Sequence, residues 1–267
     1  MRKVVSPVFQ PIVDARTGAV SHYEALARTR GVRSGHVKLL QMGEEFGFID
    51  LIDFEVLRHV FRLLRDRPYV RVAVNVSVLT IEESCNELLS LVFKNMDLAH
   101  QVVFEITETA QINDMPRIQQ FVAAVRLLNA KVAIDDFGDG FFTAPLVREI
   151  QPEYLKLSGD LVARLCSSGE ILPIRDLARS FGGELIAEHV DSEEKLARLK
   201  ELRVGLVQGF HVGPILEELP DLHADSTTLG HSAHDHLDTR SMLTWTPDPR
   251  PLGQAVGAQR RRFALLV

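Results

Sequence analysis

Short apolar runs rich in β-branched residues alternate along the chain with longer stretches in which apolar residues recur every three or four positions. The first pattern predicts strands and the second predicts amphipathic helices. The predicted strands are residues 4–13, 19–25, 70–76, 101–107, 130–136, 154–157, 184–189 and 205–212. The predicted helices are residues 51–64, 81–93, 118–128, 171–181 and 192–202, the last beginning at a Ser192 cap.

Strands that alternate with helices predict an α/β fold with a parallel sheet. Eight strands in about 220 residues suit a closed TIM-type (β/α)8 barrel. An open doubly wound sheet is the main alternative, but the glycine-rich turn expected after its first strand is not present in the sequence. Residues 14–18 have the composition of a hairpin turn. We therefore predict a modified barrel with one antiparallel strand near the N-terminus.

The composition changes after Leu222, where Ser, Thr, Gly and Pro accumulate without apolar periodicity. We predict that residues 1–221 form the barrel and that residues 222–267 form a disordered C-terminal tail.

Charge and cysteine content restrict the binding partners and the cellular compartment that we expect. The chain carries 36 acidic and 30 basic side chains, for a net charge of −6, which argues against a protein that coats DNA or an anionic membrane. Two cysteines, Cys85 and Cys166, cannot form a disulfide framework. No apolar stretch is long enough to cross a bilayer, and the N-terminal residues do not resemble a signal peptide. We expect a cytoplasmic protein without membrane insertion.

Polar residues follow the apolar runs at seven successive strands. In chain order they are Glu24, Asn75, Glu105, Asp135 with Asp136, Lys156, Glu188 and Gln208. A single residue of this kind usually belongs to a turn or a helix cap. In a β/α barrel, however, the carboxyl ends of all strands meet at one face, where active sites lie. The series therefore predicts one shared site.

The predicted cluster is rich in carboxylates. Crowded carboxylates repel each other unless protons or cations intervene. Oxygen ligands favour magnesium, manganese or calcium over zinc. The adjacent Asp135 and Asp136 suit two ions that share one carboxylate, and two ions can hold both the attacking and the leaving oxygen of a phosphoester.

The ordered series resembles the EAL-domain family of cyclic di-GMP phosphodiesterases over about residues 4 to 216. The matching segments are Phe9-Gln10-Pro11-Ile12-Val13, Glu24-Ala25-Leu26-Ala27-Arg28, Asn75-Val76-Ser77, Glu105-Ile106-Thr107-Glu108, Asp135-Asp136-Phe137-Gly138, Lys156, Ala187-Glu188 and Gln208-Gly209. The tripeptide at 24–26 alone carries little weight, whereas the ordered set is specific.

The resemblance implies hydrolysis of cyclic di-GMP to linear pGpG with two Mg²⁺ or Mn²⁺ ions. It assigns the first ion to Glu24, Asn75, Glu105 and Asp135, and the second to Asp135, Asp136 and Glu188. Lys156 and Glu188 become the catalytic residues, with Lys156 orienting or deprotonating the attacking water. Arg28, Gln208 and Asp191 become substrate contacts. Glu108 becomes a brace for the loop 137–143, which in this family couples the metal site to a dimer contact, so a homodimer is expected.

Several positions depart from the family pattern. Ser158 stands where aspartate is usual, His189 where glycine is usual, and Asp191 where glutamate is usual. The loop 137–143 also carries Asp139 and Phe142. The departures at 158, 189 and 191 are expected to lower the rate, whereas the changes in the loop fit a harmless substitution equally well. The alternative is a weak or inactive EAL domain that acts as a cyclic di-GMP receptor or protein-interaction module. The enzyme is favoured, because a receptor has no need of the complete set of catalytic residues.

Overall fold

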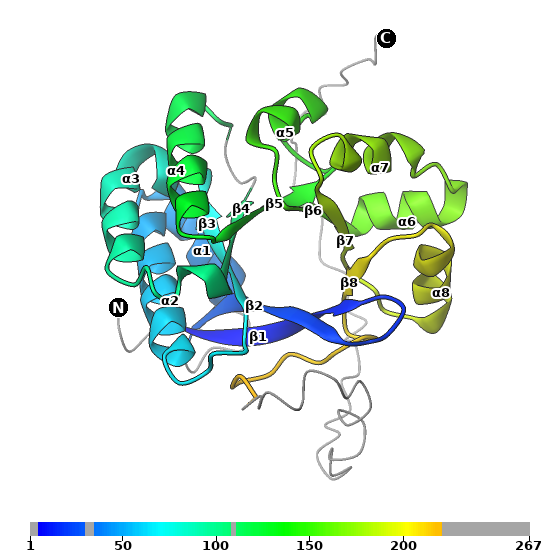
Figure 1. Cartoon of the computed structure of the whole chain (residues 1–267), viewed down its shortest axis with the longest axis horizontal. Helices are drawn as coiled ribbons and strands as arrows, with labels where there is room; N and C mark the ends of the chain where they lie inside the picture. The colour runs from blue at the N-terminus through cyan, green and yellow to red at the C-terminus, as the bar shows by residue number, and fades with distance from the viewer. Residues whose placement is uncertain (1–4, 30–34, 108–110, 221–267) are drawn as a thin grey trace, which may run out of the picture. The chain divides into compact units, whose positions relative to one another are not determined.

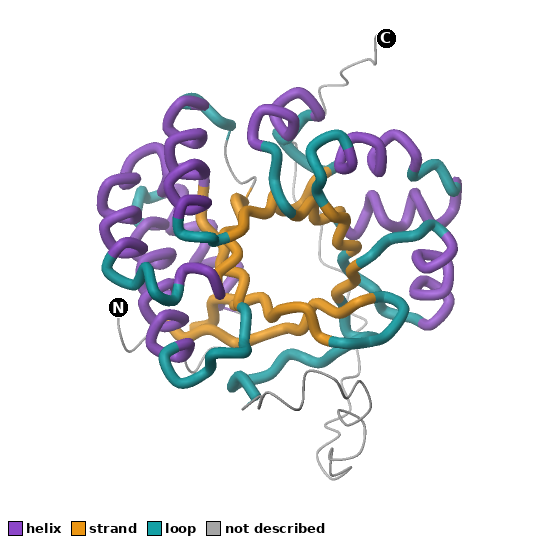
Figure 2. Tube along the Cα trace, viewed as in Figure 1, coloured by secondary structure: helices purple, strands orange, loops and turns teal. Residues whose placement is uncertain are grey.

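The computed structural model describes residues 5–29, 35–107 and 111–220, and the predicted tail lies outside this part of the chain. Eight strands form a closed barrel in chain order (Figures 1 and 2). They are β1 Val5–Asp14, β2 Val20–Thr29, β3 Val72–Ser77, β4 Val102–Thr107, β5 Lys131–Phe137, β6 Tyr154–Leu157, β7 Glu184–Ala187 and β8 Leu206–Gln208. β1 is antiparallel to both β2 and β8, and the remaining neighbours are parallel. The predicted modified barrel is confirmed.

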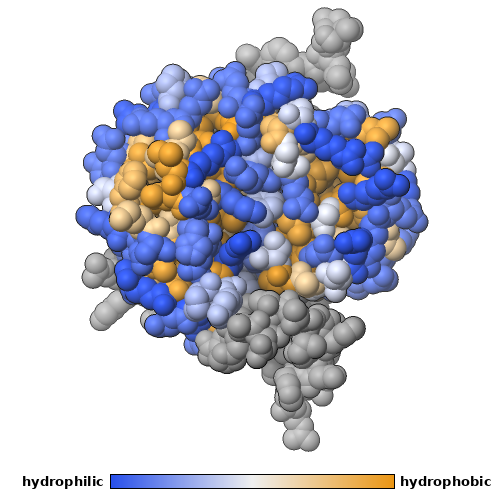
Figure 3. Space-filling view, viewed as in Figure 1, coloured by the Kyte–Doolittle hydropathy of each residue, from blue (hydrophilic) through white to orange (hydrophobic). Residues whose placement is uncertain are grey.

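Helices surround the barrel and connect its parallel strands (Figure 1). They are α1 Gly35–Glu45, α2 Ile49–Leu64, α3 Val78–Phe93, η1 Ala99–Gln101, α4 Met115–Leu127, α5 Ala144–Ile150, α6 Gly159–Ser168, α7 Leu172–Arg179 and α8 Glu193–Glu201. Hydrophilic residues cover much of this helical layer on the face shown in Figure 3. No helix among the described residues is long and apolar enough to span a bilayer.

Three α-helices, α1, α5 and α6, and the short 3-10 helix η1 were not predicted from periodicity. α5 has 7 residues and buries only Val147 and Ile150, while α6 buries only Val162 and Leu165. Two buried positions are too few to establish a helical repeat. The predicted cap of α8 is confirmed, because the Ser192 side chain accepts a hydrogen bond from Lys195 N.

The hairpin between β1 and β2 has the local chemistry that the sequence predicted. Asp14 Oδ1 accepts hydrogen bonds from Arg16 N at 2.9 Å and Thr17 N at 2.8 Å. Gly18 follows with a φ of 72°, a conformation that glycine adopts without steric cost. The resulting register places Gln10 opposite Glu24.

Most strand boundaries differ from the prediction by a few residues, and two of these differences bear on the site. β2 continues to Thr29, so Glu24 lies in the middle of its strand and not at its end. β8 ends at Gln208, although the apolar pattern ran on to residue 212. The chain turns at Gly209, where a Cβ atom would lie 2.2 Å from Val190 O, so the close approach of these backbones requires glycine.

The inward face of the barrel changes from apolar to polar along every strand except β2, which carries His22 below Glu24. Successive side chains on a strand point to opposite faces, so Ala73 and Asn75 share a face, as do Ala133 and Asp135. Below the polar positions, a buried apolar cluster fills the interior with Ile12, Ala73, Val103, Ala133, Tyr154, Ile186 and Leu206. The polar side chains of the predicted site are therefore carried at one end of a packed barrel.

Candidate functional site

Lys156 on β6 lies at the centre of the predicted cluster. Its Nζ atom is 2.7 Å from Asp135 Oδ1, 2.8 Å from Glu188 Oε1, 3.0 Å from Glu105 Oε2 and 3.2 Å from Glu24 Oε2. The lysine side chain is 1% exposed. The structure thus brings together acidic residues that are far apart in the sequence, as the strand-end series predicted.

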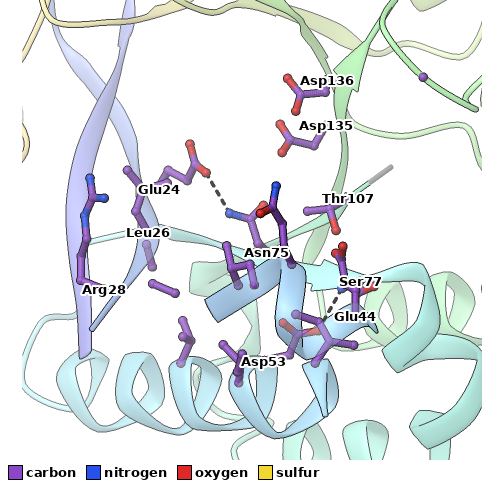
Figure 4. A pocket seen from close by; sticks show the side chains of 18 of the residues that line it. Glu24, Leu26, Arg28, Glu44, Asp53, Asn75, Ser77, Thr107, Asp135 and Asp136 are labelled. Carbon is purple, nitrogen blue, oxygen red and sulfur yellow. Dashed lines mark hydrogen bonds between the residues drawn. The ribbon is translucent and has the colours of Figure 1, made fainter. Parts of the chain in front are cut away.

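Two amide side chains complete the arrangement around Glu24. Asn75 Nδ2 donates to Glu24 Oε1 at 2.9 Å, and Gln208 Nε2 donates to Glu24 Oε2 at 2.6 Å. Gln208 Nε2 also lies 3.4 Å from Gln10 Oε1. Gln10 was not predicted as a site residue, although its place opposite Glu24 in a hairpin could have indicated it. Figure 4 shows Glu24, Asn75, Asp135 and Asp136 directed toward one another.

Burial and mutual repulsion raise the pKa values of several acidic groups in the cluster. Burial raises the pKa of Glu105 well above its usual value, and the charges of Glu24 and Asp135 add to this effect against the opposing influence of Lys156. Burial is also the main reason that the pKa of Glu188 is raised well above its usual value. The pKa of Asp136 is raised to about 6, by burial and then by the charge of Asp135.

The pKa values of Lys156 and Glu24 are shifted in the directions that favour the charged form of each group. Burial alone would lower the pKa of Lys156, but Asp135 and the other carboxylates raise it well above its usual value. Burial alone would raise the pKa of Glu24, but Lys156, Gln208 and Asn75 together lower it. Several carboxylates around one ammonium group leave an excess of negative charge, which further cations would neutralise.

The cluster fits divalent cations in its donor chemistry. Among the described residues, Asn75 Oδ1, Glu105 Oε1 and Gln208 Oε1 are buried without a hydrogen-bond partner. Carboxylate oxygens of Asp135, Asp136 and Glu188 lie within 4.8 Å of one another. Buried acceptors without partners are costly, and oxygen atoms of this kind are the ligands that Mg²⁺ and Mn²⁺ prefer.

Two cavities meet at this cluster. One has a volume of about 580 Å³ and the other about 330 Å³, and both are lined by Glu24, Leu26 and Asp135. The larger cavity extends along β2 to Arg28, and the smaller one contains Lys156. A ligand with two similar halves could therefore place its centre at the acidic residues.

The remaining predicted site residues have different placements. Glu188 follows β7, and Gln208 ends β8, so both reach the cluster. Arg28 lies on the same face of β2 as Glu24 and lines the larger cavity. Glu108 lies outside the described residues, so its bracing role stays a prediction.

The departures Ser158 and Asp191 occupy distinct environments. Ser158 is 1% exposed and caps α6, because its side chain accepts a hydrogen bond from Leu161 N. Asp191 lines the smaller cavity, yet its Oδ1 atom is 2.9 Å from Lys195 Nζ and its side chain is 66% exposed. This ion pair directs the Asp191 carboxylate toward α8.

His189 adopts a backbone conformation that favours glycine, with a φ of 53°. Its carbonyl accepts a hydrogen bond from Lys195 Nζ at 2.7 Å. Its ring packs against Gly159, where a Cβ atom would lie 2.7 Å from His189 Nδ1. The histidine thus keeps the turn that glycine would make, with a ring added at the edge of the smaller cavity.

In the loop 137–143, the adjacent Phe141 and Phe142 divide between surface and core. Phe142 is 5% exposed and belongs to the hydrophobic core, whereas Phe141 is 52% exposed. Asp139 and Gly140 line the larger cavity. The unusual Phe142 is therefore accommodated by burial, while Asp139 adds an acidic group beside the site.

A family model for the EAL domain matches residues 2–214. Cyclic di-GMP phosphodiesterase PdeF of Escherichia coli K12 is 27% identical over 229 residues, which cover 80% of this chain and 30% of PdeF. Cyclic di-GMP phosphodiesterase PdeB of Shewanella oneidensis is 29% identical over 186 residues, which cover 66% of this chain and 22% of PdeB. The chain therefore spans less than a third of the length of these relatives.

A solved structure shares the fold. Bacillus subtilis YkuI, a protein with an EAL domain solved in complex with substrate c-di-GMP and calcium, superimposes with a TM-score of 0.70 at 22% identity. The match covers 82% of this chain and 56% of the YkuI chain.

Proposed function

Because this chain belongs to the EAL-domain family, we propose that it hydrolyses cyclic di-GMP to linear pGpG, using water activated by two divalent cations. The main observation behind this proposal is the cluster around Lys156, where acidic side chains from separate strands surround one ammonium group. Buried oxygen atoms in this cluster have no hydrogen-bond partner in the described part of the chain. The names of the relatives PdeF and PdeB support the substrate and the reaction class.

The residues divide into two cation-binding sets. Glu24, Asn75, Glu105 and Asp135 would hold one Mg²⁺ or Mn²⁺, and Asp135, Asp136 and Glu188 would hold the other. When bound, such ions lower the pKa of water and neutralise charge on the phosphoester. Asn75 Oδ1 and Glu105 Oε1, which have no hydrogen-bond partner among the described residues, support the first set, and the proximity of Asp135, Asp136 and Glu188 oxygens supports the second.

Lys156 and Glu188 would act on the water. The water oxygen forms a bond to phosphorus, the bond from phosphorus to the 3′ oxygen breaks, and that oxygen receives a proton. The Lys156 ammonium has three N–H donors and contacts four carboxylates, so it would orient the water through a donor that one of these carboxylates gives up. Glu188 stands beside it with a raised pKa and could accept the proton that the water loses.

The two cavities would receive the two halves of the nucleotide. Arg28 would contact a phosphate in the larger cavity, because a guanidinium group matches phosphate geometry. Gln208 would contact the substrate from the smaller cavity, where Asp191 is also placed. Because Glu24 and Asp135 line both cavities, the phosphoester between the two halves would lie at the cluster.

The second candidate function is a receptor that binds cyclic di-GMP without hydrolysing it. The observation in its favour is the altered turn after β7, where the Asp191 carboxylate is paired with Lys195 and His189 adds a ring. Ser158 also lacks the charge that aspartate would supply.

Purified protein incubated with cyclic di-GMP and Mg²⁺ or Mn²⁺ tests the two functions. The enzyme is expected to yield linear pGpG on chromatography of the products. Tight binding of the nucleotide without any pGpG, under conditions in which both cations are present, would establish the receptor.

Removal of divalent cations is expected to abolish hydrolysis, with Mg²⁺ or Mn²⁺ restoring it and Ca²⁺ inhibiting it. Calcium accepts looser coordination and is a poorer Lewis acid for in-line attack.

Cation affinity should fall as the pH decreases through about 6, because protonation of Asp136 removes an anionic ligand.

Rates titrated with Mn²⁺ at about pH 7.5 and about pH 5.5 provide the measurement. Asp136→Asn serves as the control, since it should weaken cation binding at both pH values and reduce the difference between them. Full activity after exhaustive chelation would contradict a metal-dependent reaction.

The double change His189→Gly with Asp191→Glu is expected to raise turnover by about ten-fold, which corresponds to about 1.4 kcal/mol in transition-state free energy. Glycine relieves the left-handed backbone at position 189, and glutamate extends the carboxylate at position 191 by about 1.5 Å. Nucleotide affinity should change less than turnover, because Arg28 is untouched and glutamate keeps a carboxylate at position 191.

Asn129→Gly is the matched control for backbone strain. Asn129 has a φ of 59° and lies between α4 and β5, away from the cluster. Both sets of changes are expected to stabilise the protein, but only the pair at 189 and 191 should raise turnover. A double variant no faster than the parent would show that these departures are neutral.

We also propose that the chain forms a homodimer through the region of the loop 137–143. Phe141 in this loop is 52% exposed and so is accessible for such a contact. Light scattering of the parent and of Phe141→Ser would test it.

A further inference from the structure

β2 and β3 separate at the end of the barrel that carries the acidic cluster. Their pairing is limited to Tyr23 with Val72, Glu24 with Ala73 and Ala25 with Val74. Both strands run on beyond this point, to Thr29 and Ser77, and β3 stays paired with β4 as far as Ser77. The larger cavity lies at this separation, because it is lined by β2, the end of β3, and α1 with α2.

Asp53 on α2 covers the end of β3 at this point. Its Oδ2 atom accepts a hydrogen bond from Ser77 N at 2.9 Å and another from Thr80 Oγ1 at 2.6 Å. Ser77 is both the last residue of β3 and the cap of α3. One carboxylate oxygen therefore joins α2 to the junction of β3 and α3, as Figure 4 shows for its bond to Ser77.

The buried position of Asp53 is energetically unfavourable for a carboxyl group, unless its hydrogen bonds serve a purpose that offsets this cost. Asp53 is 6% exposed, and Ile49 and Leu57, one helical turn before and after it, are buried. Burial raises the pKa of Asp53 to about 7. An apolar residue would fill the same helix face without the cost of burying a carboxyl group.

The junction that Asp53 holds carries Asn75. Asn75 precedes Ser77 by two residues and points to the same face of β3. Its Nδ2 atom donates to Glu24 Oε1 at 2.9 Å, and its Oδ1 atom is buried without a partner in the described part of the chain. A shift of the strand end would move both atoms relative to Glu24, because β2 makes no ladder pairs with β3 beyond Val74.

We propose that Asp53 is a positioning residue, which holds the junction of β3 and α3 so that the Asn75 amide stays aligned with Glu24. This inference rests on the proposed function, since it assigns Asp53 a role in preparing the first cation set. Groups that only orient metal ligands are commonly worth about 10- to 100-fold in metal affinity or activity.

Asp53→Ala and Asp53→Asn distinguish positioning from other roles. Alanine removes both hydrogen bonds, whereas the asparagine side-chain oxygen can still accept them. Calorimetric Mn²⁺ titration should show an affinity about ten-fold or more weaker for Asp53→Ala and nearly unchanged for Asp53→Asn. The turnover rate with cyclic di-GMP should follow the same order, while the dissociation constant for the nucleotide stays nearly constant.

Asp50→Ala is the matched control on the same helix. Asp50 Oδ2 accepts a hydrogen bond from Ser84 Oγ at 3.2 Å, so it also joins α2 to α3 but away from Ser77. A loss of melting temperature is expected in both alanine variants, and weaker Mn²⁺ binding only in Asp53→Ala. Thr80→Val removes one of the two bonds to Asp53 and should give an intermediate loss, which keeps the test open if Asp53→Ala does not fold.

Equal Mn²⁺ affinity in Asp53→Ala and the parent would overturn the positioning role. So would weaker Mn²⁺ binding in Asp50→Ala of the same size, because it would show a general effect of helix packing. A loss of nucleotide affinity in Asp53→Asn equal to that in Asp53→Ala would also overturn it, by showing direct contact with the ligand. If the parent binds Mn²⁺ but yields no pGpG, the proposed function fails while the Mn²⁺ titrations still decide the role of Asp53.

Discussion

Replacement of Lys156 by alanine is expected to abolish turnover of cyclic di-GMP and to leave nucleotide binding largely intact. Lys156 is buried, and its ammonium group contacts carboxylates of Glu24, Glu105, Asp135 and Glu188. A side chain that positions or activates water contributes about 10²- to 10⁴-fold to the rate. Nucleotide affinity should depend instead on Arg28 and the cavity walls.

The same substitution should destabilise the protein in the presence of a chelator. Breaking a buried ion pair by removing one partner costs about 3–5 kcal/mol, because the other charge is left buried and unpaired. Added Mn²⁺ should restore most of this stability, since cations can neutralise the carboxylates that lose the ammonium group. Urea denaturation with and without Mn²⁺ measures the effect.

Lys131→Ala is the matched control. Lys131 begins β5, and its Nζ atom donates to Tyr154 Oη at 2.7 Å rather than to the carboxylate cluster. Its loss should reduce stability to the same extent with or without Mn²⁺ and should leave turnover near the parent value. A Lys156→Ala protein whose nucleotide binding falls as much as its turnover would contradict a role confined to the water.

Replacement of Glu24 by alanine is expected to weaken Mn²⁺ binding by about 100-fold or more and to abolish turnover, since even groups that only orient ligands are worth about 10- to 100-fold. Glu24 is 5% exposed and receives hydrogen bonds from Asn75, Gln208 and Lys156. Its loss removes one predicted ligand and leaves these buried donors without their shared acceptor.

Glu24→Gln and Glu184→Ala separate the loss of a cation ligand from the general effect of removing a glutamate side chain. Glutamine keeps the volume of the side chain but removes its charge, so it should fold well and still bind Mn²⁺ poorly. Glu184 is an exposed glutamate at the start of β7, and its replacement should leave Mn²⁺ binding unchanged. Parent-like Mn²⁺ affinity in both variants of Glu24 would remove this residue from the proposed ligand set.

The barrel and the membership of its cluster could be predicted because both depend on local patterns. Eight apolar runs interrupted by helical periods specify the strands, and Asp14 and Gly18 specify the one hairpin. The convergence of the strand ends follows from barrel topology, so a series from Asn75 to Gln208 could be placed at one mouth before any distance was known.

The tertiary structure alone decided how those residues divide their contacts. Lys156 reaches four carboxylates from separate segments, and this geometry depends on barrel closure and strand register. The ion pair of Asp191 with Lys195 and the left-handed backbone of His189 are likewise products of the folded turn. Side-chain direction at these positions is set by packing, which residue types and spacing do not encode.

Asp53 and Gln10 show the same division most clearly. The sequence by itself placed Asp53 in the predicted helix 51–64 and Gln10 in the predicted strand 4–13, and assigned neither of them to the site. Only the fold revealed the acceptor that Asp53 provides for Ser77 N and the register that sets Gln10 opposite Glu24. Local periodicity determines which elements form, but contacts between elements far apart in the chain arise only when the barrel closes, because they depend on the relative position of several strands.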